Sequence, residues 1–123
     1  MNSHLIILGA GSVADSGLPF GVQKVTLEKS VIDWQISAFS NYISEITFVG
    51  GYNIDSVMEE YPNFVYIYNE QWKTSGPCRS LEIALEQLHF LVESEEDIFI
   101  IYSDILIRKE LVEKMIVTSD QIM

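Results

Sequence analysis

Short apolar runs of strand length alternate with segments of helical periodicity along this chain. The first run, residues 5–8, contains only leucine and isoleucine, which is typical of a strand that is buried on both faces. Three more runs of this kind lie at residues 46–49, 64–68 and 98–102. Because neighbouring parallel strands need a crossover between them, the alternation predicts an α/β fold with a mainly parallel sheet.

The segments between these runs carry helical signals. Ser30 and Asp33 have the serine-x-x-acid spacing of a capping box, which marks the start of a helix. The apolar positions at helical spacing that follow are Ile32, Ile36, Phe39 and Ile43. Further helices are expected at residues 54–60, 79–93 and 109–117, the last with a stripe of Leu111, Val112, Met115 and Ile116.

Length and composition limit the class of protein. With 123 residues the chain suffices for one hydrophobic core, so we expect a single domain over residues 1–123. Eighteen acidic residues against seven basic ones give a net charge of −11, which argues against nucleic acid or a membrane surface as a partner. One cysteine cannot form an internal disulfide, and no signal segment or bilayer-spanning run is seen, so a cytoplasmic protein is expected.

A glycine-rich stretch follows the first predicted strand. Gly9 and Gly11 begin the spacing Gly-x-Gly-x-x-Ala, the loose form of the dinucleotide-binding fingerprint. That fingerprint requires a helix to open at once, whereas Gly17 and Pro19 interrupt one here, so a nicotinamide or flavin site is disfavoured. What remains is a loop whose consecutive backbone N–H groups at residues 9–12 can surround phosphate oxygens. A plain tight turn is the alternative.

Two charged side chains stand out by position. Lys24 comes just after the glycine loop, where it can neutralise a phosphate, although a solvated surface lysine is the simpler interpretation. Asp104 follows the fourth predicted strand, and ligands of open α/β sheets bind outside such strand ends. A carboxylate there can hold Mg²⁺ beside substrate phosphates, and a turn or helix cap is the alternative. Trp72, in a polar loop, is a candidate for ligand contact.

Taken together, these segments resemble the nucleotidyltransferases that activate sugar phosphates or phosphocholine-like alcohol phosphates. The resemblance covers nearly all of residues 5–113, and the order and spacing of its pieces are more specific than any one piece. The matching segments are Leu8-Gly9-Ala10-Gly11-Ser12, Lys24, Ile32-Asp33-Trp34-Gln35-Ile36, Phe48-Val49-Gly50-Gly51-Tyr52, Tyr68-Asn69-Glu70-Gln71-Trp72, Ser80-Leu81 and Asp104.

The resemblance implies a Rossmann-like domain of the nucleotide-diphospho-sugar transferase type and an Mg²⁺-dependent enzyme. In such an enzyme an acceptor phosphate attacks the α-phosphorus of a nucleoside triphosphate (CTP, UTP or dTTP) and pyrophosphate leaves. This reaction depends on positioning and charge neutralisation more than on a covalent nucleophile. The product would be an NDP-sugar or a CDP-alcohol.

The resemblance also implies roles for particular residues. Lys24 and Asp104 would be catalytic, and Asp104 would bind the metal. The positions implied to bind the nucleotide are Leu8, Gly9, Ala10, Gly11, Ser12, Lys24 and Ser80.

Two departures from the family keep a second function open. In the family an arginine usually follows the glycine pair, where this chain has Val13-Ala14-Asp15, with an acid instead of a cation. A proline usually follows the lysine, where this chain has Val25. The family's second metal-binding aspartate and its acceptor pocket lie beyond the position of Met123, so we expect the fold to be incomplete at its C-terminus. The chain would then form a homo-oligomer or belong to a longer polypeptide. A non-catalytic nucleotide-sensing or assembly module that keeps the fold is the alternative.

Overall fold

The computed structural model describes residues 3–9, 19–22, 24–26, 28–74, 76–88 and 97–122, and for residues 20, 77 and 117–122 it describes the backbone alone. The fold is a Rossmann-like α/β structure, as the sequence predicts. Its four strands are β1 (Ser3–Leu8), β2 (Glu45–Gly50), β3 (Val65–Tyr68) and β4 (Asp97–Tyr102). They pair in the order β3-β2-β1-β4, and every pairing is parallel.

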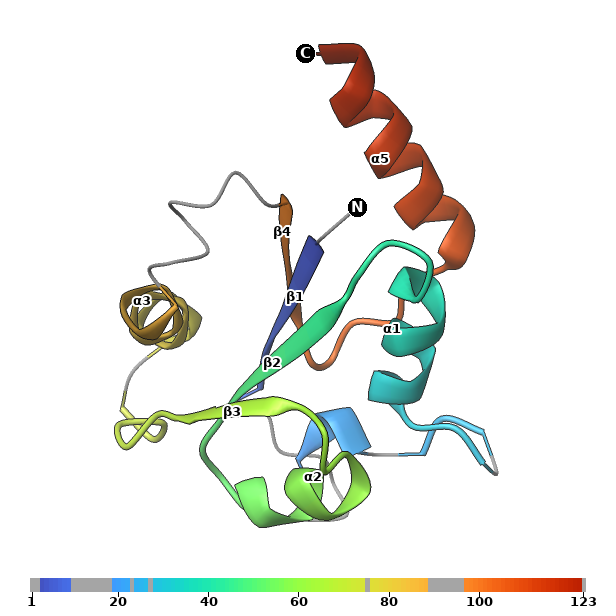
Figure 1. Ribbon diagram of the computed structural model, residues 1–123. Helices are drawn as coiled ribbons and strands as arrows, with labels where there is room; N and C mark the ends of the chain where they lie inside the picture. The colour runs from blue at the N-terminus through green and yellow to red at the C-terminus, as the bar shows by residue number, and fades with distance from the viewer. Residues whose placement is uncertain are drawn as a thin grey trace.

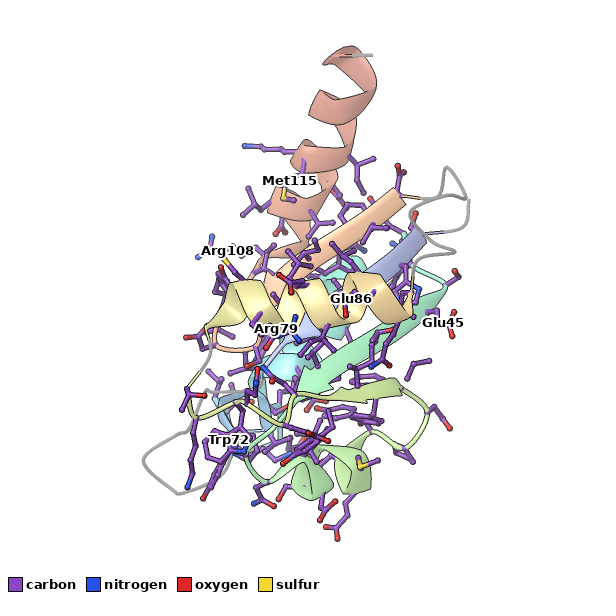
Figure 2. The ribbon with its side chains drawn as sticks, turned by 90° about the vertical axis from the view of Figure 1, so that its left-hand side faces the viewer. Glu45, Trp72, Arg79, Glu86, Arg108 and Met115 are labelled. Carbon is purple, nitrogen blue, oxygen red and sulfur yellow. The ribbon has the colours of Figure 1, made fainter. Side chains whose placement is uncertain are left out.

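The helices lie on both faces of this sheet (Figure 1). They are η1 (Phe20–Val22), α1 (Val31–Phe39), α2 (Ile54–Glu60), α3 (Pro77–Gln87) and α5 (Lys109–Ile122). α3 lies on one face, and α1 and α5 lie on the other. Figure 2 shows α3 in front of the strands, with Arg79 and Glu86 along its length.

The predicted helices are confirmed with shifted ends. α2 has the expected bounds, whereas α3 begins two residues earlier than expected and the expected residues 89–93 lie outside the described residues. α1 ends at Phe39, so Ile43 lies beyond the helix, yet it still packs against the same core. α5 runs past the expected end at residue 117. None of the described helices is long and apolar enough to cross a bilayer.

The core is divided by β1, whose side chains alternate between the two faces. Leu5 and Ile7 pack in the cluster that includes Ile32 of α1 and Val112 of α5. Ile6 and Leu8 pack in the other cluster, with Ala84 and Leu88 from the α3 side. Burial on both faces explains why residues 5–8 form an unbroken apolar run rather than an alternating one.

β4 forms one edge of the sheet, and its side chains on the α3 side are less buried than those of β1. Ile100 is 47% exposed although it pairs with Ile6, which is fully buried. On α5 the expected apolar stripe is only partly correct. Val112 is fully buried, whereas Leu111 and Met115 are 51% and 42% exposed. Figure 2 shows Met115 on the part of α5 that projects beyond the sheet, so this end of the helix has little of the described structure to pack against.

Candidate functional site

The carboxyl ends of β1 and β4 meet at one edge of the sheet. The backbone N–H of Ser103 donates to the carbonyl of Leu8 at 3.0 Å, and that of Gly9 donates to the carbonyl of Val49 at 2.9 Å. These bonds extend the sheet by one residue beyond each strand. They place Leu8 and Gly9 next to Ser103, the residue that precedes Asp104.

Gly9 is required at this edge for a steric reason. A Cβ atom at this position would lie 2.6 Å from Cζ of Phe48 and 2.9 Å from Oγ of Ser103. Its N–H is used by the sheet, so a phosphate contact from this loop would have to come from the residues that follow. Those predicted contacts, Ala10, Gly11 and Ser12, lie outside the described residues.

The turn after β4 places one polar side chain inside the protein and one outside. Ser103 is buried, and its Oγ has no hydrogen-bond partner among the residues that the structure describes. Asp104, the next residue, is exposed to solvent. No group of three potential metal ligands occurs within the described residues, so Mg²⁺ at Asp104 would need phosphate and water oxygens as its other ligands.

Lys24 lies on the strap of residues 24–30 that leads into α1. It is exposed, and it forms an antiparallel bridge with Ser30. Within the strap, the N–H of Val25 donates to the carbonyl of Lys29 at 2.8 Å. Lys24 is therefore held at its backbone beside the start of α1, and its charge acts on Asp33.

The predicted capping box is present and includes a third residue. The N–H of Ser30 donates to a carboxylate oxygen of Asp33 at 2.9 Å, and the N–H of Asp33 donates to Oγ of Ser30 at 3.2 Å. The hydroxyl of Tyr61 donates to the other oxygen of Asp33 at 2.6 Å and lies 2.6 Å from Oγ of Ser30. The sequence indicated Tyr61 only as the end of α2, because a contact between residues 28 positions apart leaves no local signal.

This network shifts two pKa values in opposite directions. Burial by itself would raise the pKa of Asp33, but the hydrogen bonds from Tyr61 and Ser30, with the charge of Lys24, lower it below its usual value. Burial and the bond to Asp33 raise the pKa of Tyr61. Asp33 therefore stays ionised near the strap that carries Lys24.

Gln35 connects α1 to the turn that carries Asp104. Its side chain is fully buried, and its Nε2 donates to the carbonyls of Tyr102 at 2.9 Å and Ile105 at 2.7 Å. The sequence places Gln35 in a matching motif without a role. Gln35 shares a face of the helix with the buried residues Ile32 and Ala38, and this spacing could have indicated that it points inward.

Ser80 lies in the first turns of α3, where it is buried. Nδ2 of Asn69, which is also buried, donates to Oγ of Ser80 at 3.0 Å, and Oδ1 of Asn69 accepts from the N–H of Gln71 at 2.9 Å. Ser80 thus ties α3 to the end of β3. The structure does not bring its hydroxyl beside Asp104 in any described contact.

Trp72 packs on the protein itself. Its ring lies against the backbone of Gly51 and 5.4 Å from the ring of Tyr52, in a tilted arrangement. In Figure 2 Trp72 lies at the end of the sheet opposite Glu45, which begins β2. The residue is therefore at the carboxyl end of the strands, where ligands bind, although much of its ring serves packing.

Comparison with known proteins supports the fold. No family model matches the chain, and none of the curated proteins matches it. Among solved structures it is similar to a CTP:phosphocholine cytidylyltransferase from Streptococcus pneumoniae, with a TM-score of 0.64 and 20% sequence identity. The match covers 89% of this chain and 50% of that one, so the chain spans half the length of that enzyme's structure. The chain therefore shares the Rossmann-like α/β fold of that structure over the matched part.

Proposed function

We propose that this chain is the nucleotide-binding part of an Mg²⁺-dependent nucleotidyltransferase. It would transfer a nucleoside monophosphate from CTP, UTP or dTTP to a phosphorylated sugar or a small phosphorylated alcohol. An oxygen of the acceptor phosphate attacks the α-phosphorus, the bond from that phosphorus to the bridging oxygen breaks, and pyrophosphate leaves.

One observation supports this proposal most directly. The matched structure is a cytidylyltransferase, and Gly9 lies against Ser103, the residue before Asp104, at the edge where parallel α/β sheets bind ligands. The loop leaves β1 at this edge, and Lys24 stands on the strap that follows it. Anion-binding backbone, a cation and a carboxylate are the groups that a nucleotide with its metal requires.

The residues have separate tasks in this proposal. Ala10, Gly11 and Ser12 would surround the phosphates, Lys24 would neutralise their charge, and Ser80 would support the base or acceptor side. Bound at Asp104, Mg²⁺ would neutralise charge on the triphosphate and on the departing pyrophosphate. With a net charge of −11, the chain has few other means to attract a triphosphate.

The first test concerns the metal. Calorimetric titration of CTP, UTP and dTTP, with and without Mg²⁺, should show tighter binding of one nucleotide when Mg²⁺ is present. Asp104→Asn should abolish that enhancement, because the amide keeps the shape of the side chain and loses its charge. An unchanged enhancement in this variant would leave Asp104 as a turn residue.

The second test concerns the cation. Lys24→Ala should weaken nucleotide binding by about 1.5–3 kcal/mol, the range for a hydrogen bond to a charged group. Lys114→Ala, which removes an exposed lysine from α5, is the matched control. Lys29 is a poorer control because its Nζ lies 4.7 Å from the ring of Trp34. Equal losses at Lys24 and Lys114 would indicate the general field of the protein rather than a specific contact.

A nucleotide-sensing or assembly module is the second candidate. It is favoured by Asp15 near the position where the family carries an arginine. A pyrophosphate-release assay with phosphocholine and sugar 1-phosphates separates the two. Binding with Mg²⁺ enhancement but no pyrophosphate would favour the module, whereas turnover would establish the enzyme.

A further inference from the structure

The turn that carries Asp104 is held by a side chain from a distant part of the chain. Nε2 of Gln35 donates to the carbonyls of Tyr102 and Ile105, which precede and follow the turn. The partners are 67 and 70 positions away along the sequence. Both N–H groups of one carboxamide are thus used on the two sides of Asp104.

A second set of contacts holds the same turn from the direction of β1. The N–H of Ser103 donates to the carbonyl of Leu8, and the side chain of Ser103 lies against Gly9 and Gly21 with no room for a Cβ at Gly9. The backbone around Asp104 is therefore fixed by α1 and by β1, while the carboxylate itself projects into solvent.

Packing by itself does not require glutamine at position 35. The side chain is fully buried, and within the described part of the chain its Oε1 has no hydrogen-bond partner. A buried polar atom without a partner is unfavourable, and a methionine of similar length would fill the space without one. The arrangement is understandable if the two donated hydrogen bonds serve the turn.

We propose that Gln35 is a positioning residue that sets the place of the Asp104 carboxylate for the metal–nucleotide complex. This proposal rests on the proposed function. Gln35 touches neither nucleotide nor metal, so its effect acts through Asp104. Its loss should therefore weaken the Mg²⁺-dependent part of nucleotide binding and leave the metal-free part alone.

A calorimetric cycle tests this directly. CTP, or whichever nucleotide binds best, is titrated into the wild type, Gln35→Met, Asp104→Asn and the double variant, with and without Mg²⁺. Gln35→Met should lose about tenfold or more of the Mg²⁺ enhancement, since a misplacement of about 1 Å can cost a hundredfold at a site of this kind. Nucleotide affinity without Mg²⁺ should stay within about twofold of the wild type. The double variant should lose no more of the Mg²⁺ enhancement than Asp104→Asn does, because both changes act on one interaction.

Two controls separate positioning from general damage. Gln87→Met makes the same substitution at an exposed position of α3 and should change nothing. Amide hydrogen exchange without nucleotide should be faster at residues 103–106 in Gln35→Met and unchanged in Gln87→Met. In the wild type, the carboxamide protons of Gln35 should give resolved NMR signals that are protected from exchange, a measurement that needs no variant.

The outcomes are distinguishable. A folded Gln35→Met with the full Mg²⁺ enhancement, an equal loss with and without Mg²⁺, or an unprotected Gln35 carboxamide in the wild type would each overturn the positioning role. If the wild type binds none of the three nucleotides, the proposed function fails and this role fails with it. In that case the exchange data still show whether Gln35 holds the turn.

Discussion

Two buried carboxamides hold strand-end turns in this protein, and they do so differently. Asn69 follows β3, and both ends of its side chain are used, toward Ser80 and toward the N–H of Gln71. Gln35 on α1 uses its nitrogen twice and leaves its oxygen buried without a partner. Both side chains are fully buried.

The difference indicates what each turn is optimised for. The Asn69 turn is closed by partners at most 11 positions away, and every described polar atom of its side chain is paired. The Gln35 turn depends on residues far away in the sequence and tolerates an unpaired oxygen. The first arrangement stabilises the fold locally, whereas in our proposal the second fixes the geometry of the turn that carries Asp104, at some expense in stability.

The largest expected effect on stability is at Asn69. Asn69→Ala should lower the free energy of unfolding by about 2–4 kcal/mol, because it removes two hydrogen bonds and leaves the buried hydroxyl of Ser80 with one partner fewer. Urea denaturation measures this, with Asn63→Ala at an exposed turn as the control. If Asn69→Ala lowered the free energy of unfolding by less than Gln35→Met does, the Asn69 turn would not be the one that contributes more to stability.

Ser80→Ala tests the same turn from the other partner. It should cost about 1–2 kcal/mol, since Nδ2 of Asn69 then lacks this acceptor in a buried site. Nucleotide affinity separates this structural role from the role in binding proposed for Ser80. A loss of affinity larger than that caused by Asn69→Ala would favour direct contact with the ligand.

Gln35→Met should change stability by less than about 1 kcal/mol. The two lost hydrogen bonds are offset by removal of a buried, unpaired oxygen. The ranking of the two amides would then be opposite for stability and for Mg²⁺-dependent binding. Thermal unfolding of both variants beside the calorimetry checks this, and parallel rankings in the two measurements would contradict it.

The smallest expected effect on stability is at Asp33, whose network is charged and therefore depends on pH, unlike the two carboxamides. Because the pKa of Asp33 is lowered in the folded state, its contribution is fully present above the ordinary carboxyl pKa of 3.8 and is lost as the pH falls through the folded value. Asp33→Asn should therefore cost about 0.5 kcal/mol at pH 7 and nothing near pH 2. Neither amide variant should show this dependence, because a carboxamide does not titrate. Urea midpoints between pH 2 and pH 7 provide the measurement.

The sequence predicted what depends on local pattern. The four strands, the bounds of α2 and the capping box of Ser30 and Asp33 are confirmed, because periodicity and short-range hydrogen bonds determine them. It did not predict the hydrogen bond from Tyr61 to Asp33, because a strand and a helix separate the two residues along the chain. It also overestimated the apolar face of α5, because spacing shows which side chains share a face and not whether anything covers Leu111 and Met115.

The site was predictable to a similar extent. The sequence predicted that Asp104 follows a buried strand, and it lies two residues beyond the end of β4. Two hydrogen bonds could not be predicted in this way, that from the Gly9 N–H to Val49 and that from Gln35 to Tyr102. They depend on strand register and helix orientation, which no single segment of the sequence determines. Lys24, Asp104 and Ser80 keep their proposed roles until nucleotide binding is measured.

The central place of β1 has a consequence for how the chain is made. Among the described strands β1 leaves the ribosome first, and its two neighbours in the sheet are β2 and β4, which leaves after the other three. The part of the sheet formed by β1, β2 and β3 can assemble during synthesis, but the other edge of β1 stays unpaired until residues 97–102 have emerged. Pairing between the most distant strands is slow, because the intervening loop must be closed first. A product that stalls before β4 therefore presents Leu5, Ile6 and Ile7 along an open edge and is a substrate for chaperones and proteases.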